Sequence, residues 1–67
     1  MTLSRADFHA RNLAGAQSEA LRLFEQRAVL QGAWLSWVAS QIYLLRPAEY
    51  ASMVRKELMR LQEISEN

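Results

Sequence analysis

Few side chains in this sequence could carry catalytic or metal chemistry. His9 is the single histidine and there is no cysteine, so the donor set of a structural zinc site is lacking. On a helix, neither Asp7 nor Arg11 would share the face of His9, because helical neighbours lie three and four residues apart. No hydroxyl has a paired base, and no glycine-rich phosphate loop is present. We therefore predict a surface histidine, no enzyme, no metal and no cofactor.

The residues best suited to contact another protein are aromatic residues and an arginine. Tyr43, Arg46 and Tyr50 are grouped where two helices are expected to meet, and Trp, Tyr and Arg dominate binding hot spots. Trp34 and Trp37 either belong to the core or a self-interface, or at least one of them anchors a different protein. The alternative for the two tyrosines is sideways packing with their hydroxyl groups in water. These five residues form the predicted partner-binding set.

The charge distribution argues against a nucleic-acid partner. The formal net charge is +1. Residues 1–45 carry four Arg against one Asp and two Glu, and residues 46–67 carry four Arg or Lys against four Glu. Neither part forms the basic stripe that phosphate binding requires, so we expect no nucleic-acid binding.

Neither an export signal nor a membrane span is expected. Residues 1–13 contain no continuous apolar core and include Asp7 and Arg11, unlike a signal peptide. The apolar run over residues 29–45 is interrupted by Ser and Gln, and it is shorter than the roughly 20 residues that a bilayer requires. We expect a cytoplasmic protein.

A long first helix is expected from about residue 4 to residue 45. Ser4 and Asp7 fit a capping box, good helix formers dominate the residues after it, and nothing forces a stop before the single proline. Such a helix would be about 60 Å long at 1.5 Å per residue. Gly15 and Gly32 weaken it by about 1 kcal/mol each. A continuous or gently kinked helix is favoured; alternatively Gly15 ends a short first helix, or the small residues around it let another helix approach closely.

Two apolar stripes run along this helix at three- and four-residue steps. The first comprises Leu21, Phe24, Ala28, Leu35, Val38, Ile42 and Leu45. The second comprises Leu23, Leu30, Trp34, Trp37 and Leu44. After Leu30 the stripes merge, and a helix that is apolar on every side must be covered on every side.

Pro47 ends the first helix, because in a helix interior its ring would clash with a preceding carbonyl. Proline suits the first position of a second helix, which we expect from about residue 47 to 64 after a turn at 46–47. A connection this short favours antiparallel packing, with Leu35 and Val38 on the face that meets the second helix. The apolar stripe of that helix comprises Ala51, Val54, Leu58, Leu61 and Ile64.

The unequal helix lengths predict self-association. The second helix covers the first only from about Leu45 back to Arg27, and a chain of 67 residues without disulfides has a marginal core. We therefore predict an all-α fold with a single domain over residues 1–67. It is an antiparallel helical hairpin that dimerises into a four-helix bundle. The predicted dimer or core residues are Leu21, Phe24, Leu30, Leu35, Val38, Ile42, Val54, Leu58 and Leu61.

The layout resembles a family of small early proteins of Pseudomonas phages. The shared features are the Arg- and Ala-rich first helix, the Trp-rich stretch and the sequence Leu-Leu-Arg-Pro-Ala-Glu-Tyr over residues 44–50. Members of the anti-activator type are dimeric helical hairpins that bind a quorum-sensing regulator and block its DNA binding. The resemblance implies the same activity here, in the cytoplasm of the bacterial host, with a second target in the ATPase that assembles type IV pili. It places a tyrosine contact on Tyr43 or Tyr50.

Two other resemblances leave alternatives open. Pro47-Ala48-Glu49-Tyr50 is similar to the start of the second helix in co-chaperones of type III secretion needle subunits, although these lack a comparable Trp-rich helix. The third alternative is a dimeric RNA-binding hairpin, as in plasmid copy-number regulators. The balanced charge of the chain argues against it. We expect a non-enzymatic module that inhibits a bacterial regulatory or motor protein by occupying its surface.

Overall fold

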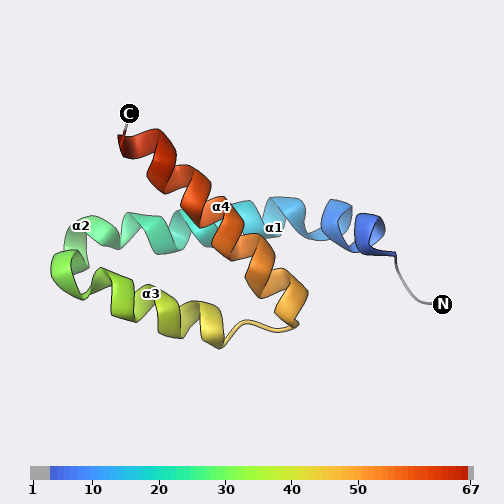
Figure 1. The fold of residues 1–67 in the computed structure, drawn as a ribbon, viewed down its shortest axis with the longest axis horizontal. Helices are drawn as coiled ribbons and strands as arrows, with labels where there is room; N and C mark the ends of the chain where they lie inside the picture. Colours follow the sequence, from blue (N-terminus) through green and yellow to red (C-terminus); the bar gives the residue numbers. More distant parts are fainter. Residues whose placement is uncertain (1–3, 67) are drawn as a thin grey trace.

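The computed structural model describes residues 4–66, and every regular element among them is helical. In chain order these are α1 (Arg5–Glu25), α2 (Arg27–Leu30), the 3₁₀ turn η1 (Gln31–Ala33), α3 (Trp34–Tyr43) and α4 (Ala48–Glu66). Figure 1 shows α1 and α3 side by side with the chain reversing between them, and α4 crossing α1. The predicted all-α class and the return of the chain after Pro47 are confirmed.

Helix α1 begins as the sequence indicates. The Ser4 side chain accepts a hydrogen bond from the Asp7 backbone N–H at 3.1 Å, which satisfies one of the donors left unpaired at a helix start. The helix continues through Gly15, so the interpretation that Gly15 ends a short helix is wrong. Tyr50 of α4 lies next to Gly15, since a Cβ there would be in ordinary van der Waals contact at 3.6 Å from its hydroxyl oxygen, and the neighbouring Ala16 is completely buried.

The continuous helix predicted for residues 4–45 is wrong. It is interrupted at Gln26 and again at η1. Gln31 has φ 49° and ψ −116°, a backbone conformation that costs conformational free energy for any residue with a Cβ. Folding α3 back onto α1 buries Trp34, whose indole N–H donates to the Leu23 carbonyl at 2.9 Å. The burial of an indole offsets the cost of the reversal. Helix propensities do not include this burial, so they could not predict the reversal.

Helix α4 starts one residue later than predicted and runs to Glu66. It follows a cis Arg46–Pro47 peptide bond. The Pro47 carbonyl accepts hydrogen bonds from the Tyr50 and Ala51 backbone N–H groups at 3.0 and 3.2 Å. These bonds form the first turn of the helix, as the position of the proline indicates.

The packing partner of α4 differs from the prediction. We expected α4 to lie along residues 27–45; instead it packs mainly on α1. The reason is the small-residue surface of α1, where Ala16 and Ala20 are completely buried. Short side chains let two helix backbones approach closely, so Val54 and Leu58 of α4 fill the space above them.

The core joins all three long helices. Its buried members are Ala16, Ala20, Leu23, Trp34, Val38, Met53, Val54 and Leu58. Phe8, Leu13, Phe24, Leu30, Trp37, Ile42, Leu45, Tyr50 and Leu61 are partly buried against them. Val38, Ile42, Val54, Leu58 and Leu61 of the predicted dimer or core set are thus buried or partly buried, whereas Ile64, predicted on the apolar stripe of α4, is 60% exposed.

Two predicted core or dimer residues do not belong to this core. Leu35 is 68% exposed and Leu21 is 49% exposed. The prediction that Leu35 meets the second helix is wrong, because Trp34 and Val38 define the inner face of α3 and Leu35 is turned away from it. One residue along a helix is a rotation of about 100°, which moves a side chain from the core to the surface.

Candidate protein-binding surfaces

Trp34 is a core residue and not a partner contact, which corrects its place in the predicted binding set. It is only 2% exposed. The Phe24 ring meets it edge-on, with centroids 6.2 Å apart and planes at 84°, an arrangement that aromatic quadrupoles favour. Trp37 is partly buried against the same core. Trp34 therefore has almost no surface with which to contact a second protein, whereas Trp37 keeps part of its surface.

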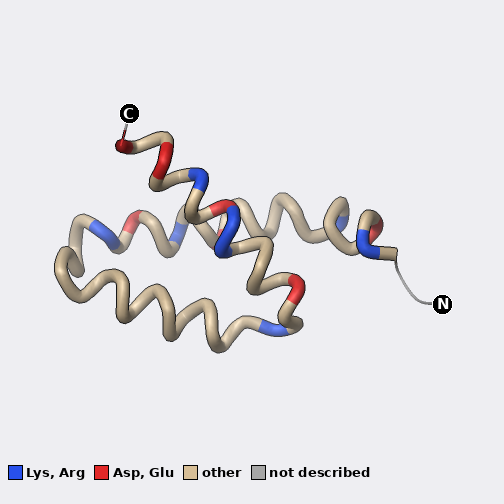
Figure 2. The backbone as a smooth tube through the Cα atoms, viewed as in Figure 1, with Lys and Arg blue, Asp and Glu red and all other residues tan. Residues whose placement is uncertain are grey.

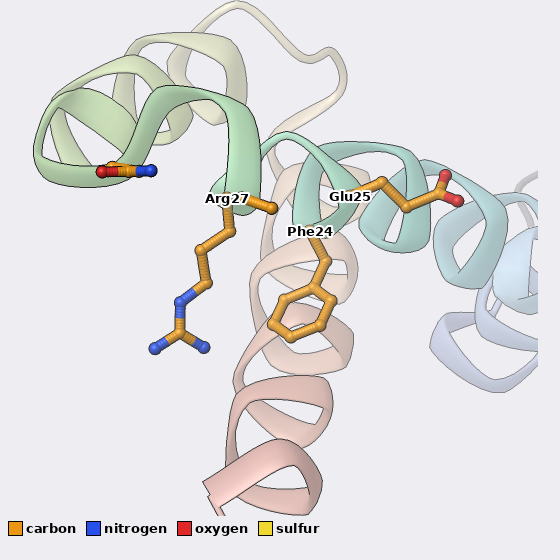
Figure 3. Close-up of a pocket in the computed structure, with 5 residues that line it drawn as sticks. Phe24, Glu25 and Arg27 are labelled. Atoms are coloured by element: carbon orange, nitrogen blue, oxygen red, sulfur yellow. The ribbon is translucent and has the colours of Figure 1, made fainter.

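An open hollow lies beside this aromatic pair. Figure 3 shows the Phe24 ring and the Arg27 side chain pointing the same way from the α1–α2 junction, with Glu25 pointing away. The Arg27 guanidinium lies 5.8 Å from the ring centroids of both Phe24 and Trp34, and Arg27 Nη1 lies 3.4 Å from the Ser65 hydroxyl oxygen on α4. Arg27 thus caps the aromatic pair and ties α2 to the end of α4, a structural role.

The structure separates Tyr50 from Tyr43 and Arg46, the other two residues of the predicted group at the turn. Tyr43 is 77% exposed. Tyr50 is partly buried, with its hydroxyl group near Gly15. The Arg46 guanidinium donates to the carbonyls of Tyr43 and Leu45 at 2.8 and 3.0 Å. Only two of the three residues therefore share a surface.

Leu44 completes that surface, and the prediction overlooked its role. It is 69% exposed, between Tyr43 and the arginine. We name Tyr43, Leu44 and Arg46 the turn surface. The sequence signal was present, since Leu44 immediately follows the last turn of α3 and precedes the proline break. It was assigned to an apolar stripe instead.

The outer face of α3 is the second exposed surface. It consists of Leu35, Ser36, Ala39, Ser40 and Tyr43, all exposed. No Asp, Glu, Lys or Arg occurs between Arg27 and Arg46, and Figure 2 shows this part of the chain without a charged residue. Solvated helix faces ordinarily carry charge, and this one instead carries only neutral residues, with a leucine and a tyrosine at its ends.

A cleft separates the first halves of α1 and α4. Phe8, Leu13 and Met53 are its apolar lining, and its rim comprises His9 and the charged residues Arg5, Glu49, Arg55, Lys56 and Glu57. Glu57 is paired with Arg60 at 2.7 Å. His9 is exposed at this rim and is not brought next to a carboxylate by any hydrogen bond that the structure describes. The cleft therefore offers a surface of mixed charge.

The described residues give no sign of metal binding or of a membrane span. Among residues 4–66, no three His, Cys, Asp or Glu side chains are grouped as a metal site would need. No helix in that range is both long and apolar enough to cross a bilayer.

No protein-family model, curated protein or solved structure matches this chain. The resemblances to phage anti-activators and secretion co-chaperones accordingly stay predictions.

Proposed function

We propose that this protein is a non-enzymatic binding module that inhibits a bacterial protein by occupying its surface, and that the turn surface makes the contact. The observation that carries the proposal is the exposure of Tyr43 and Leu44 beside Arg46. Tyrosine and arginine are the residue types in which binding energy concentrates.

One residue of the turn surface, Arg46, is also held in place before binding. The Arg46 guanidinium donates to two backbone carbonyls of the same turn, so its side chain has lost part of its conformational freedom in the free protein. A contact side chain that is already ordered costs less to immobilise on binding. An ordered arginine beside an exposed tyrosine and leucine suits a small inhibitor with few residues available for recognition.

Homodimerisation is part of the proposal. The core is small for a folded domain, and chains of this length commonly need a second copy, a metal or disulfides. Cysteine is absent. Large side chains such as Leu35 and Val29 are exposed along the uncharged part of the chain. Light scattering at micromolar concentration should give about twice the mass of 7.7 kDa.

Because the chain resembles phage anti-activators, the functional test uses Pseudomonas as the host. Wild type, Arg46→Ala and Leu44→Ser are expressed in Pseudomonas beside Arg11→Ala, which removes an exposed arginine from α1. A quorum-sensing reporter and twitching motility are read together. Wild type and Arg11→Ala should suppress at least one readout, and the two turn variants should weaken suppression by about 10-fold or more in effective concentration.

Three outcomes decide against this proposal. If both readouts are untouched by wild type, inhibition of a quorum-sensing regulator or pilus motor is excluded. If wild type instead keeps a secretion needle subunit soluble, the co-chaperone function replaces it. Sub-micromolar, salt-dependent binding of RNA would establish the RNA-binding alternative.

A further inference from the structure

We propose that the cleft between the first halves of α1 and α4 binds a small anionic amphiphile, a free molecule that carries a carboxylate on an apolar chain. The lining of this cleft comes from both helices and includes none of Tyr43, Leu44 and Arg46. The inference therefore adds a ligand site to the proposed inhibition and does not rest on the turn surface.

The cleft has the size and the floor of a small-molecule site. Its volume is about 690 Å³, within the range of roughly 300–1,000 Å³ that such sites occupy. Phe8 and Leu13 of α1 form the floor together with Met53 of α4. Phe8 and Leu13 are partly buried against the core and Met53 belongs to it, so the packing of the two helices holds the floor in place. Covering the apolar surface that still borders the cleft is favourable.

Positive charge exceeds negative charge at the rim of the cleft. Its basic residues are Arg5, Arg55 and Lys56, and its acidic residues are Glu49 and Glu57. Three cations against two carboxylates leave a formal charge of +1 with the histidine neutral, which equals the formal charge of the whole chain. The charged residues outside the cleft therefore balance one another.

Ion pairing within the chain increases this excess. The structure describes two ion pairs in residues 4–66, Glu19–Arg22 and Glu57–Arg60. Arg60 does not line the cleft, so it neutralises Glu57 from outside, whereas the basic residues of the rim belong to neither pair. An anionic group in the cleft therefore meets three cations and a single carboxylate that lacks an ion-pair partner in this part of the chain. Such complementarity of charge selects the sign of a ligand.

The position of the apolar residues favours a free molecule over a membrane surface. A protein that lies on a bilayer inserts apolar side chains that project from an amphipathic helix. Here Met53 is only 8% exposed, and Phe8 and Leu13 are partly buried. A bilayer does not reach side chains that are recessed between two helices, whereas a single apolar chain can enter the cleft. A partner helix would need anchoring positions over several turns, which three floor residues do not provide.

Three ligands separate the contribution of the head group from that of the chain. Decanoate, decylammonium and butanoate are titrated separately into the full-length protein, each below the concentration at which it forms micelles, and the backbone amide signals are followed by NMR. Decanoate should shift the signals of floor and rim residues. Its dissociation constant should be about 10-fold or more below that of decylammonium, which has the opposite charge. Butanoate, with the same head group and a shorter chain, should also bind about 10-fold or more weakly.

Two substitutions of the same kind locate the binding. Arg55→Gln removes a positive charge from the rim and should weaken decanoate binding by roughly 3-fold or more. Arg11→Gln removes an arginine of α1 that does not line the cleft and should leave decanoate binding unchanged. Both arginines are exposed, so both variants should fold as the wild type does, which thermal denaturation checks.

The outcomes separate this inference from the proposed function. Equal affinities for decanoate and decylammonium, or equal effects of Arg55→Gln and Arg11→Gln, would overturn the anionic site. Binding to phosphatidylglycerol vesicles without binding of decanoate would replace it with a membrane surface. Absence of any decanoate-induced shift in the lining overturns the site and leaves the proposed inhibition standing. Decanoate binding that persists in Arg46→Ala supports a site separate from the turn surface.

Discussion

Apolar residues are placed differently at the α1–α4 crossing and in α3. Where α4 crosses α1, Ala20 and Val54 are completely buried, and the solvent sides carry paired charges such as Glu19–Arg22 and Glu57–Arg60. In α3 only the inner side is buried, and the outer side is apolar or small and uncharged. The number of apolar residues in a helix therefore does not indicate how much of it is buried within the chain. In this molecule, burial goes together with charged residues on the opposite face of the helix.

The largest effect should come from the inner side of α3. Trp34→Ala removes a buried ring and leaves the Leu23 carbonyl without its donor, so we expect a loss of about 3–5 kcal/mol in unfolding free energy. Urea denaturation followed by circular dichroism measures it. Trp37→Ala, at a partly buried position, is the comparison and should cost clearly less. Equal losses would mean that Trp34 does not hold the reversal of the chain.

The contrast between the two sides of α3 should appear in a pair of smaller changes. Val38 is buried, so Val38→Ala should destabilise the fold by about 1–3 kcal/mol in urea denaturation. Leu35→Ala should change it by less than about 0.5 kcal/mol, because its side chain is mostly exposed. A large loss of unfolding free energy in Leu35→Ala would place this residue in the core.

The helix cap should contribute about as much as a single hydrogen bond. Ser4→Ala removes the acceptor for the Asp7 N–H and should cost about 1 kcal/mol. Ser4→Asp should retain most of that stability, since a carboxylate at this position also accepts and interacts favourably with the helix dipole. Denaturation midpoints of the two variants provide the measurement, and a cap effect near zero would show that the first turn of α1 does not contribute to the folded state.

The smallest effect should be a gain at the reversal. Gln31→Gly relieves a positive φ of 49° and should stabilise the protein by up to about 1 kcal/mol. Gly32→Ala is the partner variant: its added Cβ meets nothing within 4 Å and its φ is not positive. A loss of stability in Gln31→Gly would show that the glutamine side chain has a role beyond its backbone conformation.

The candidate sites were predictable only in part. Helix type, the Ser4 cap, the proline boundary and most core positions of α4 followed from propensity and spacing. Tyr43 and Arg46 were chosen correctly as exposed residues by their position at the turn. Trp34 and Tyr50 were not, because a hot-spot residue type does not indicate which side of a helix faces the core. The α1–α4 cleft joins residues far apart in the chain, and no spacing rule could bring them together.

The amino-acid sequence by itself determined that the chain is helical, that it turns at Pro47 and that the stretch between Arg27 and Arg46 carries no charge. Only the tertiary structure decided that the first helix reverses at Gln31–Ala33, that α4 packs on α1, and that Leu35 faces outward while Trp34 faces in. The physical reason is that local propensities differ by about 1 kcal/mol per residue. Burying an indole and closing two helices over Ala16 and Ala20 is worth several times that, so packing overrides the local preference for a straight helix.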